Sequence, residues 1–415
     1  MSTQVTISEV PLLDLNAQYN QIKDEVKEAI DRVLESQYFI MGPEVKDFEN
    51  KVAEYCGVEH AIGCASGSDA LLLSLMALDI GPGDAVITTP FTFFATAGAI
   101  ARLGARPVFL DIDPASYNID TEQIELFLKG DHPLNKKLNI YQESVKAIMP
   151  VHLYGQMADM DPIMEIVKTY DIKVIEDAAQ AIGSEYKGQR AGSIGDFGCF
   201  SFFPSKNLGG YGDGGLVTTN NKKMAEKLSV LRLHGAKPKY HHSLVGINSR
   251  LDALQAAVLN VKLKYLDEWS NSSREKALRY NNLFKKYNLN SRPKDYPPHS
   301  DKSFSELKKH ILTPREVAGN PADKGRHVYH QYVIRTGARK KITQAFDKNN
   351  IGYSVYYPVP LHEQECFKYL GYESSDCAVS TTASNTTLAL PMYPELTDSQ
   401  QEYVVRTIKE TIEDL

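Results

Sequence analysis

The runs IKVIEDAAQ (residues 172–180) and GCFSFFPSKNLG (residues 198–209) decide the fold. The first reads as a buried strand that ends at Asp177. An acid at the carboxyl end of a parallel strand lies where open α/β proteins bind ligands, although an aspartate there can equally cap the following turn. The second run places Lys206 just past its apolar part, in a segment rich in Pro and Gly. A partly desolvated lysine amine near an acid forms Schiff bases with carbonyl compounds, whereas a lone lysine is usually a surface charge.

Short apolar runs of the same kind recur along the chain and alternate with helical patterns. The strand-like runs are HAIGC (60–64), AVITT (85–89), PVFLDI (107–112), KAIMPVH (146–152) and GGLVTT (214–219). The helical stretches are Ala17 to Ser36, a segment after Pro43, Asp69 to Leu78, Thr92 to Leu103 and Ala158 to Tyr170. Alternating strands and helices predict an α/β fold with a mainly parallel central sheet.

The remaining third of the sequence has a different pattern. A long helical pattern runs from Arg250 to Trp269 and beyond, and a polar stretch from about 291 to 327 reads as an insertion. The expected elements after it are a strand at 327–335, a helix at 340–350, a strand at 352–357 and a helix at 398–415. We therefore predict a large α/β domain with the N-terminal helices over residues 1–265, and a smaller α+β domain over residues 266–415.

Composition excludes several classes of protein. The 415 residues carry 46 basic and 52 acidic side chains, a net charge of −6, which disfavours a nucleic-acid partner. The five cysteines are scattered and form no C-x-x-C pair, which favours a reducing compartment over a disulfide framework or a zinc ribbon. The sequence has no leader-like N-terminus, and its apolar runs are too short to span a membrane. We expect a cytoplasmic protein without a membrane anchor.

Two other motifs predict neither a dinucleotide site nor a metal site. Gly210, Gly212 and Gly215 match G-x-G-x-x-G, but they lead into a strand-like run, whereas a dinucleotide fingerprint must open a helix. Histidines 241 and 242, and 327 and 330, lack a carboxylate at metal-binding spacing, so no metal site is expected.

The longer motifs around Asp177 and Lys206 resemble the DegT/DnrJ/EryC1/StrS family of sugar aminotransferases. The matching stretches are PLLDLNAQY, YFIMGPEV, CASGSDAL, TPFTFFATAGAI, EDAAQAIG, SFFPSKNLGGYGDGG, GINSRLDALQAAVL, YYPVPLH and ALPMYPELT. They extend over nearly the whole chain. The resemblance implies the aspartate-aminotransferase (type I) fold, pyridoxal 5′-phosphate (PLP) as cofactor, and a homodimer with composite active sites.

The resemblance also implies roles for residues near the cofactor ring. Lys206 would form the covalent Schiff-base link to PLP and then move the proton between substrate and cofactor. Asp177 would bind the pyridine nitrogen and keep it protonated, and Gln180 would lie near the phenolic oxygen. Phe93 would stack on the ring, whereas one of Phe93 and Phe94 can be a plain core aromatic.

A second group would hold the phosphate and the sugar nucleotide. The expected phosphate ligands are Ser66, Gly67, Ser68, Asp69 and Ser201, with Asn248 from the partner subunit. The four residues 66–69 precede a helix, whose N-terminus favours an anion, but alone they would more often be a simple cap. The expected substrate contacts are His152, Arg250, His327 and Tyr329.

The resemblance finally implies a reaction. A related branch of the family has histidine in place of the lysine and removes a hydroxyl, so Lys206 favours transamination, with L-glutamate as amino donor. Sequence similarity around residues 234–257 favours amination of the third sugar carbon of UDP-2-acetamido-2-deoxy-3-oxo-D-glucuronate or a related UDP-2-acetamido-3-oxo-hexose. The product would enter bacterial surface polysaccharide such as lipopolysaccharide O-antigen.

Three alternatives remain open at this stage. One is a dTDP-3-oxo-6-deoxyhexose 3-aminotransferase, and another is an enzyme acting on a 4-keto sugar. The third is a non-catalytic regulatory protein that keeps the fold, which would be expected to have lost the lysine or the ring-binding acid.

Overall fold

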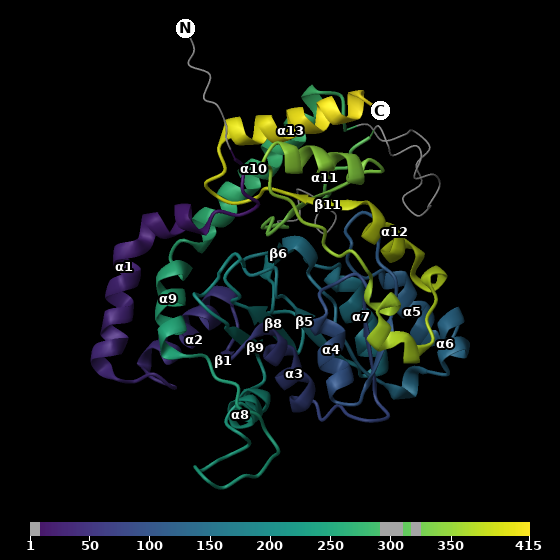
Figure 1. The fold of residues 1–415 in the computed structure, drawn as a ribbon. Coiled ribbons are helices and arrows are strands. Elements are labelled where there is room, and N and C mark those ends of the chain that lie inside the picture. The colour runs from purple at the N-terminus through teal and green to yellow at the C-terminus, as the bar shows by residue number, and fades with distance from the viewer. Residues whose placement is uncertain (1–8, 291–309, 317–324) are drawn as a thin grey trace.

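A seven-stranded sheet forms the centre of the protein (Figure 1). The computed structural model describes residues 9–290, 310–316 and 325–415. The sheet strands are β1 (His60–Cys64), β2 (Ala85–Thr88), β3 (Arg106–Phe109), β4 (Val145–Ile148), β5 (Lys173–Asp177), β8 (Phe197–Ser201) and β9 (Gly215–Thr219). Their order is β1-β9-β8-β5-β4-β2-β3, and only β9 runs against its neighbours. The predicted α/β fold with a mainly parallel sheet is confirmed.

Helices cover both faces of this sheet. They are α1 (Leu15–Ser36), α2 (Pro43–Cys56), α3 (Gly67–Ala77), α4 (Ala95–Arg102), α5 (Thr121–Lys129), α6 (Pro133–Leu138), α7 (Met160–Tyr170), α8 (Lys222–Leu231) and α9 (Ala253–Leu263). Successive strand residues point to opposite faces, so Val174 packs in the core with α1, α2, α7 and α9, whereas Ile175 packs in the core with α3 and α8. Burial on both faces explains why the parallel strands are continuous apolar runs.

The C-terminal part of the chain forms a second core above the sheet (Figure 1). Its elements are α10 (Leu266–Lys286), β10 (Tyr332–Arg335), α11 (Arg339–Lys348), α12 (Ala378–Thr386), β11 (Thr387–Leu390) and α13 (Asp398–Glu413). β10 and β11 pair antiparallel, and α13 begins with a capping box between Thr397 and Gln400. A separate short hairpin, β6 (Glu185–Tyr186) and β7 (Gln189–Arg190), lies in the large domain.

The boundary between the two cores differs in detail from the division at residue 265. Val10 pairs with Ile351 and is buried in the C-terminal core, so a residue that precedes the large domain in the sequence packs in the small one. Helix α10 belongs to both cores: Trp269 packs in the large one and Tyr280 in the small one. The predicted insertion, 291–327, lies largely outside the described residues.

Three predicted elements differ from the structure. The helical pattern after Arg250 is two helices, α9 and α10, because the residues between them keep nearly helical dihedral angles and a periodic pattern does not reveal so short a break. Only the second half of 327–335 is a strand, since Tyr329 has a left-handed φ of 47° and Val328 donates to the Gly155 carbonyl. In 352–357, Ser354 alone pairs with β11, as an isolated bridge to Ala389.

A buried ion pair ties α2, β1 and the end of α8 together. Arg232 Nη1 lies 2.5 Å from Glu49 Oε1 and donates to the Gly63 carbonyl at 2.6 Å. The same Glu49 oxygen accepts the Gly63 N–H at 2.9 Å. Both side chains are less than one-tenth exposed. Within the described part of the chain, no helix is long and apolar enough to cross a membrane.

Replacing Arg232 with Met should destabilise the fold strongly, because it leaves the Glu49 carboxylate buried without its cation. We expect a loss of about 3–5 kcal/mol in the free energy of unfolding, measured by denaturant titration. Lys51→Met is the control, since it breaks the exposed Lys51–Asp47 pair and should cost about 0.5 kcal/mol or less. Equal losses in the two variants would contradict a structural role for the buried pair.

Candidate active site

Three strand ends bring the candidate residues to one edge of the sheet. Asp177 ends β5 and Ser201 ends β8, and these strands are parallel neighbours. Strand β1 also points this way, because it and β8 are both antiparallel to β9. Ser66 follows β1 directly. The carboxyl ends of β1, β5 and β8 therefore meet, as expected for a ligand site in an open α/β sheet.

Asp177 is buried, with 5% of its surface exposed, and is held on both carboxylate oxygens. Its Oδ2 accepts the Thr96 hydroxyl at 2.8 Å, and its Oδ1 accepts the Ala179 N–H at 3.3 Å. Burial raises the pKa of Asp177, while Thr96, Ala179 and the nearby charge of Lys206 act against the rise. A cation placed against this carboxylate would offset its burial cost, which suits a protonated ring nitrogen.

Lys206 lies in the turn that follows β8. Its N–H donates to the Phe203 carbonyl at 2.8 Å. Burial lowers the pKa of the Lys206 amine to about 8, even though the Asp177 carboxylate acts in the opposite direction. A lysine with this pKa has a substantial unprotonated fraction near neutral pH, which is the form that attacks a carbonyl carbon.

Helix α9 fixes the loop that follows Lys206. The Lys262 ammonium, 2% exposed, donates to the Gly209 carbonyl at 2.8 Å. Gln255 Oε1 accepts the Tyr211 N–H at 2.7 Å. The Lys262 ammonium also lies 4.7 Å from the centre of the Tyr211 ring, and burial lowers its pKa to about 8. Two side chains of one helix thus restrain the backbone on the C-terminal side of Lys206.

The start of α3 forms a cradle against β8. Ser66 caps the helix by accepting the Asp69 N–H at 3.1 Å, and Asp69 accepts the Ser249 hydroxyl at 2.7 Å. Gly67 packs so closely on Ser201 that a Cβ at Gly67 would lie 2.5 Å from the Ser201 Cβ. Ser68 is exposed. Backbone N–H groups and serine hydroxyls at a helix N-terminus are the donors that a phosphate requires, so the cradle fits the expected group.

The adjacent phenylalanines 93 and 94 remain half-exposed, Phe93 at 58% and Phe94 at 48%. Phe94 stacks on Phe367, with ring centres 5.7 Å apart. Phe93 instead lies beside Tyr357, with ring centres 6.3 Å apart. The Phe93 ring therefore offers the free aromatic surface that a cofactor ring needs, and Phe94 is the one bound into other packing.

Gln180 has two hydrogen bonds on its amide. Its Oε1 accepts the Tyr154 N–H at 2.8 Å, and its Nε2 donates to the Tyr357 hydroxyl at 3.0 Å. Tyr357 lies in the segment between α11 and α12. No role for it was predicted from the sequence. The motif YYPVPLH was the available signal, but nothing in its pattern shows which large-domain residue it meets.

His152 does not face a substrate. It is fully buried, its Nε2 lies 2.9 Å from Glu176 Oε2, and its Nδ1 accepts the Ala158 N–H at 3.1 Å. Both ring nitrogens are therefore used inside the protein, and the expected sugar contact through them is corrected to a structural role. The residue missed by the sequence analysis is Glu176, which also accepts the N–H groups of Gly192, Ile194 and Gly195 at 2.9, 2.8 and 2.7 Å.

His327 and Tyr329 are buried and stack on each other, with ring centres 3.7 Å apart. His327 Nδ1 accepts the Tyr329 N–H at 2.9 Å, and the Tyr329 hydroxyl lies 3.1 Å from Glu316 Oε1. Burial, helped by Arg274, lowers the pKa of His327 to about 3. Their side chains thus support the backbone of 327–330 rather than opening onto the Lys206 site. His330 is nearer, because the Lys206 charge, after burial, lowers its pKa.

Asn248 and Arg250 lie at the base of an arm, residues 233–250, that extends from the end of α8 (Figure 1). Asn248 is exposed and Arg250 is partly buried. The neighbouring Ser249 hydroxyl accepts the Ala65 N–H at 3.1 Å, so the base of the arm lies beside the phosphate cradle of its own chain. Tyr240 and Val245 on the arm are 79% and 92% exposed.

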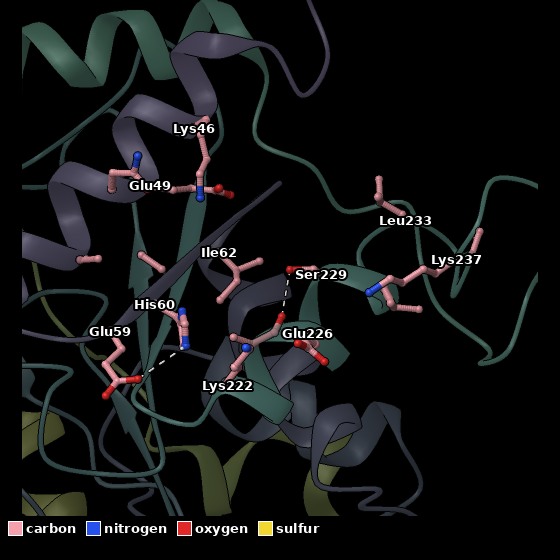
Figure 2. Close-up of a pocket in the computed structure, with 16 residues that line it drawn as sticks. Lys46, Glu49, Glu59, His60, Ile62, Lys222, Glu226, Ser229, Leu233 and Lys237 are labelled. Carbon is pink, nitrogen blue, oxygen red and sulfur yellow. Dashed lines mark hydrogen bonds and ion pairs between the residues drawn. The ribbon is translucent and has the colours of Figure 1, made fainter.

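A cavity of about 440 Å³ lies between α2, β1, α8 and the first residues of the arm (Figure 2). Lys46, Lys222 and Lys237 line it together with Glu59 and Glu226. None of the candidate residues contributes to its lining. The cavity is therefore separate from the arrangement around Lys206 and Asp177.

Comparison with known proteins agrees with the geometry. The model of the DegT/DnrJ/EryC1/StrS aminotransferase family matches residues 20–409. A protein of Geobacillus stearothermophilus named pleiotropic regulatory protein is 46% identical over 97% of this chain and 98% of its own length.

Two further relatives are named as enzymes. The UDP-2-acetamido-2-deoxy-3-oxo-D-glucuronate aminotransferase of Pseudomonas aeruginosa is 39% identical over 93% of this chain and 96% of its own. The dTDP-3-amino-3,6-dideoxy-alpha-D-galactopyranose transaminase of Aneurinibacillus thermoaerophilus is also 39% identical, over 96% and 98%.

Solved structures share the fold. The crystal structure of DesV from S. venezuelae in complex with a ketimine intermediate superposes with a TM-score of 0.85, at 34% identity, over 99% of this chain and 100% of its own. A lysine with a lowered pKa, a buried acid and a phosphate cradle are the parts that PLP chemistry needs. The chain therefore belongs to the DegT/DnrJ/EryC1/StrS aminotransferase family, and it is a PLP-dependent sugar-nucleotide aminotransferase.

Proposed function

We propose that the protein moves the amino group of L-glutamate to the C3 carbonyl of UDP-2-acetamido-2-deoxy-3-oxo-D-glucuronate, in the cytoplasm, for a bacterial surface polysaccharide. Glutamate leaves as 2-oxoglutarate, and the sugar ketone becomes an amine, so atoms and electrons balance between the two half-reactions. The observation that carries the proposal is the placement of Lys206 in the turn after β8, beside β5, the neighbouring strand that ends in the buried Asp177.

Each residue around Lys206 has its own role in the proposed reaction. PLP, when bound, supplies an electron sink for the carbon that loses or gains a proton. Lys206 holds and returns that proton at its Nζ, and Asp177 keeps its negative charge beside the ring nitrogen. Ser66, Gly67 and Ser201 bind the phosphate. Phe93 packs on the ring and excludes water from one side.

Arg250 supports the uronate as substrate. Across the described residues its guanidinium has no hydrogen bond or ion pair, yet the side chain is partly buried at the base of the arm. A sugar carboxylate would give this charge a partner, whereas a 6-deoxyhexose would not. A dTDP-3-oxo-6-deoxyhexose is the alternative substrate, because the relative named dTDP-3-amino-3,6-dideoxy-alpha-D-galactopyranose transaminase has the same 39% identity as the uronate aminotransferase.

A regulatory role is the second candidate, because the relative with 46% identity is named a regulatory protein. That name does not exclude an enzyme. Both groups that a non-catalytic descendant would lose are present at the site, Asp177 buried and Lys206 partly buried.

The substrate assignment predicts a dependence on Arg250. With glutamate as donor, kcat/KM should be at least tenfold higher for the UDP uronate than for dTDP-3-oxo-6-deoxyglucose. Arg250→Met should lower kcat/KM for the uronate by about 10- to 100-fold, the value of one charge-assisted hydrogen-bonded pair. It should affect UDP-2-acetamido-3-oxo-glucose, which lacks the carboxylate, much less. Equal losses on both sugars would contradict the carboxylate contact.

The charge of Asp177 near Lys206 predicts that removing this charge lowers the pKa of the Lys206 amine. The Asp177 charge raises the pKa of Lys206, so Asp177→Asn should lower the pKa of the amine from about 8, by up to about one unit. The pH dependence of Lys206 acylation in cofactor-free protein, followed by peptide mass spectrometry, measures it. Asp47→Asn on the exposed side of α2 is the control. An unchanged midpoint in Asp177→Asn would mean that Asp177 carries no charge beside the amine.

We further propose a homodimer in which Asn248 of one subunit serves the phosphate site of the other. The exposed apolar side chains of Tyr240 and Val245 on the arm support a partner surface. Lys206→Ala and Asn248→Ala should each be inactive alone, and mixing them should restore up to about a quarter of the wild-type activity, from the statistical share of intact sites. Subunit exchange is verified with differently tagged chains. No recovery despite exchange would place Asn248 in the site of its own chain.

A further inference from the structure

The orientation of the Gln180 amide is fixed by a main-chain group. The Tyr154 N–H can only donate, so the atom it meets at 2.8 Å must be the Gln180 carbonyl oxygen. The nitrogen end of the amide is then turned toward the Tyr357 hydroxyl, 3.0 Å away. An amide nitrogen has two N–H groups, and the Tyr357 hydroxyl takes one of them.

Tyr357 is itself held firmly in this place. Its ring meets Phe91 edge-on, with ring centres 6.2 Å apart, and lies 6.3 Å from the Phe93 ring. The Tyr154 hydroxyl donates to the carbonyl of the preceding residue, Tyr356. Burial raises the pKa of Tyr357, with a smaller contribution from Asp177, so its hydroxyl stays neutral. Tyr154 thus fixes both ends of the contact: the Gln180 amide by its N–H, and the Tyr357 segment by its hydroxyl.

We propose that Tyr357 is a positioning residue for the cofactor site: it takes one N–H of Gln180 and leaves the other directed at the phenolic oxygen of PLP. The proposal rests on the proposed place of Gln180 beside that oxygen. Tyr357 belongs to the segment between α11 and α12, so the small domain of the same chain completes the ring end of the site. The Tyr154 N–H meanwhile excludes the flipped amide, which would present its oxygen to a negatively charged phenolic oxygen and repel it.

The test is a pH titration of the visible absorption of the PLP-loaded protein without any sugar. The titration removes a proton that lies next to the phenolic oxygen. A hydrogen-bond donor to that oxygen stabilises the state without the proton and therefore lowers the midpoint. Tyr357→Phe releases the amide and should therefore raise the midpoint, by about half a unit to one unit, the size of one weakened hydrogen bond. Tyr356→Phe is the matched control, because it removes the neighbouring hydroxyl, for which no hydrogen bond is found in the described residues.

Variants of Gln180 separate the positioning role of Tyr357 from the proposed place of Gln180 beside the phenolic oxygen. Gln180→Leu alone should raise the midpoint; no shift would mean that Gln180 does not reach the phenolic oxygen, and the proposed role of Gln180 would fail. A shift in Gln180→Leu without one in Tyr357→Phe would overturn the positioning role alone. In the Gln180→Leu background, Tyr357→Phe should add nothing. A persistent shift there would mean that Tyr357 acts on the cofactor directly, which also overturns the proposal.

Discussion

The fully buried carboxylate of Glu176 is the constraint on which the site depends. Burial alone would raise its pKa, but the hydrogen bond from His152 and the N–H groups of the 192–195 loop hold it below the ordinary value. The loop leads into β8, and the strand that bears Glu176 ends one residue later at Asp177. One anion thus ties the strand of the ring-binding acid to the strand that leads to Lys206. Removing any of its donors would leave charge uncompensated in the interior.

The residues at the strand ends could be predicted from the sequence. Parallel strands place their carboxyl ends at the same edge of the sheet, whatever their order along the chain. Asp177, Ser201 and the cradle at Ser66 and Gly67 follow from that rule and from the motif resemblance. The strands themselves were predictable because burial on both faces makes each one a continuous apolar run.

The roles of His152 and Tyr357 could not be predicted from strand ends or motifs. A histidine at the end of a strand-like run reads as a ligand contact, and only the three-dimensional contacts show that Glu176 and the Ala158 N–H occupy both its nitrogens. Tyr357 follows Gln180 by 177 positions, and their contact depends on how the two domains pack. The expected strand at 352–357 failed for a related reason: Tyr356 and Tyr357 pack in a cluster with Phe91 of the large domain, and only Ser354 pairs with β11.

Helix α10 has a mechanical consequence for how substrates enter. It is continuous from Leu266 to Lys286, and its two ends are anchored in different hydrophobic cores. One continuous helix therefore connects the two cores. A wide hinge opening between them would have to break main-chain hydrogen bonds of α10. We therefore expect a bulky nucleotide sugar to enter and leave through rearrangement of the loops at the sheet edge more than through domain closure.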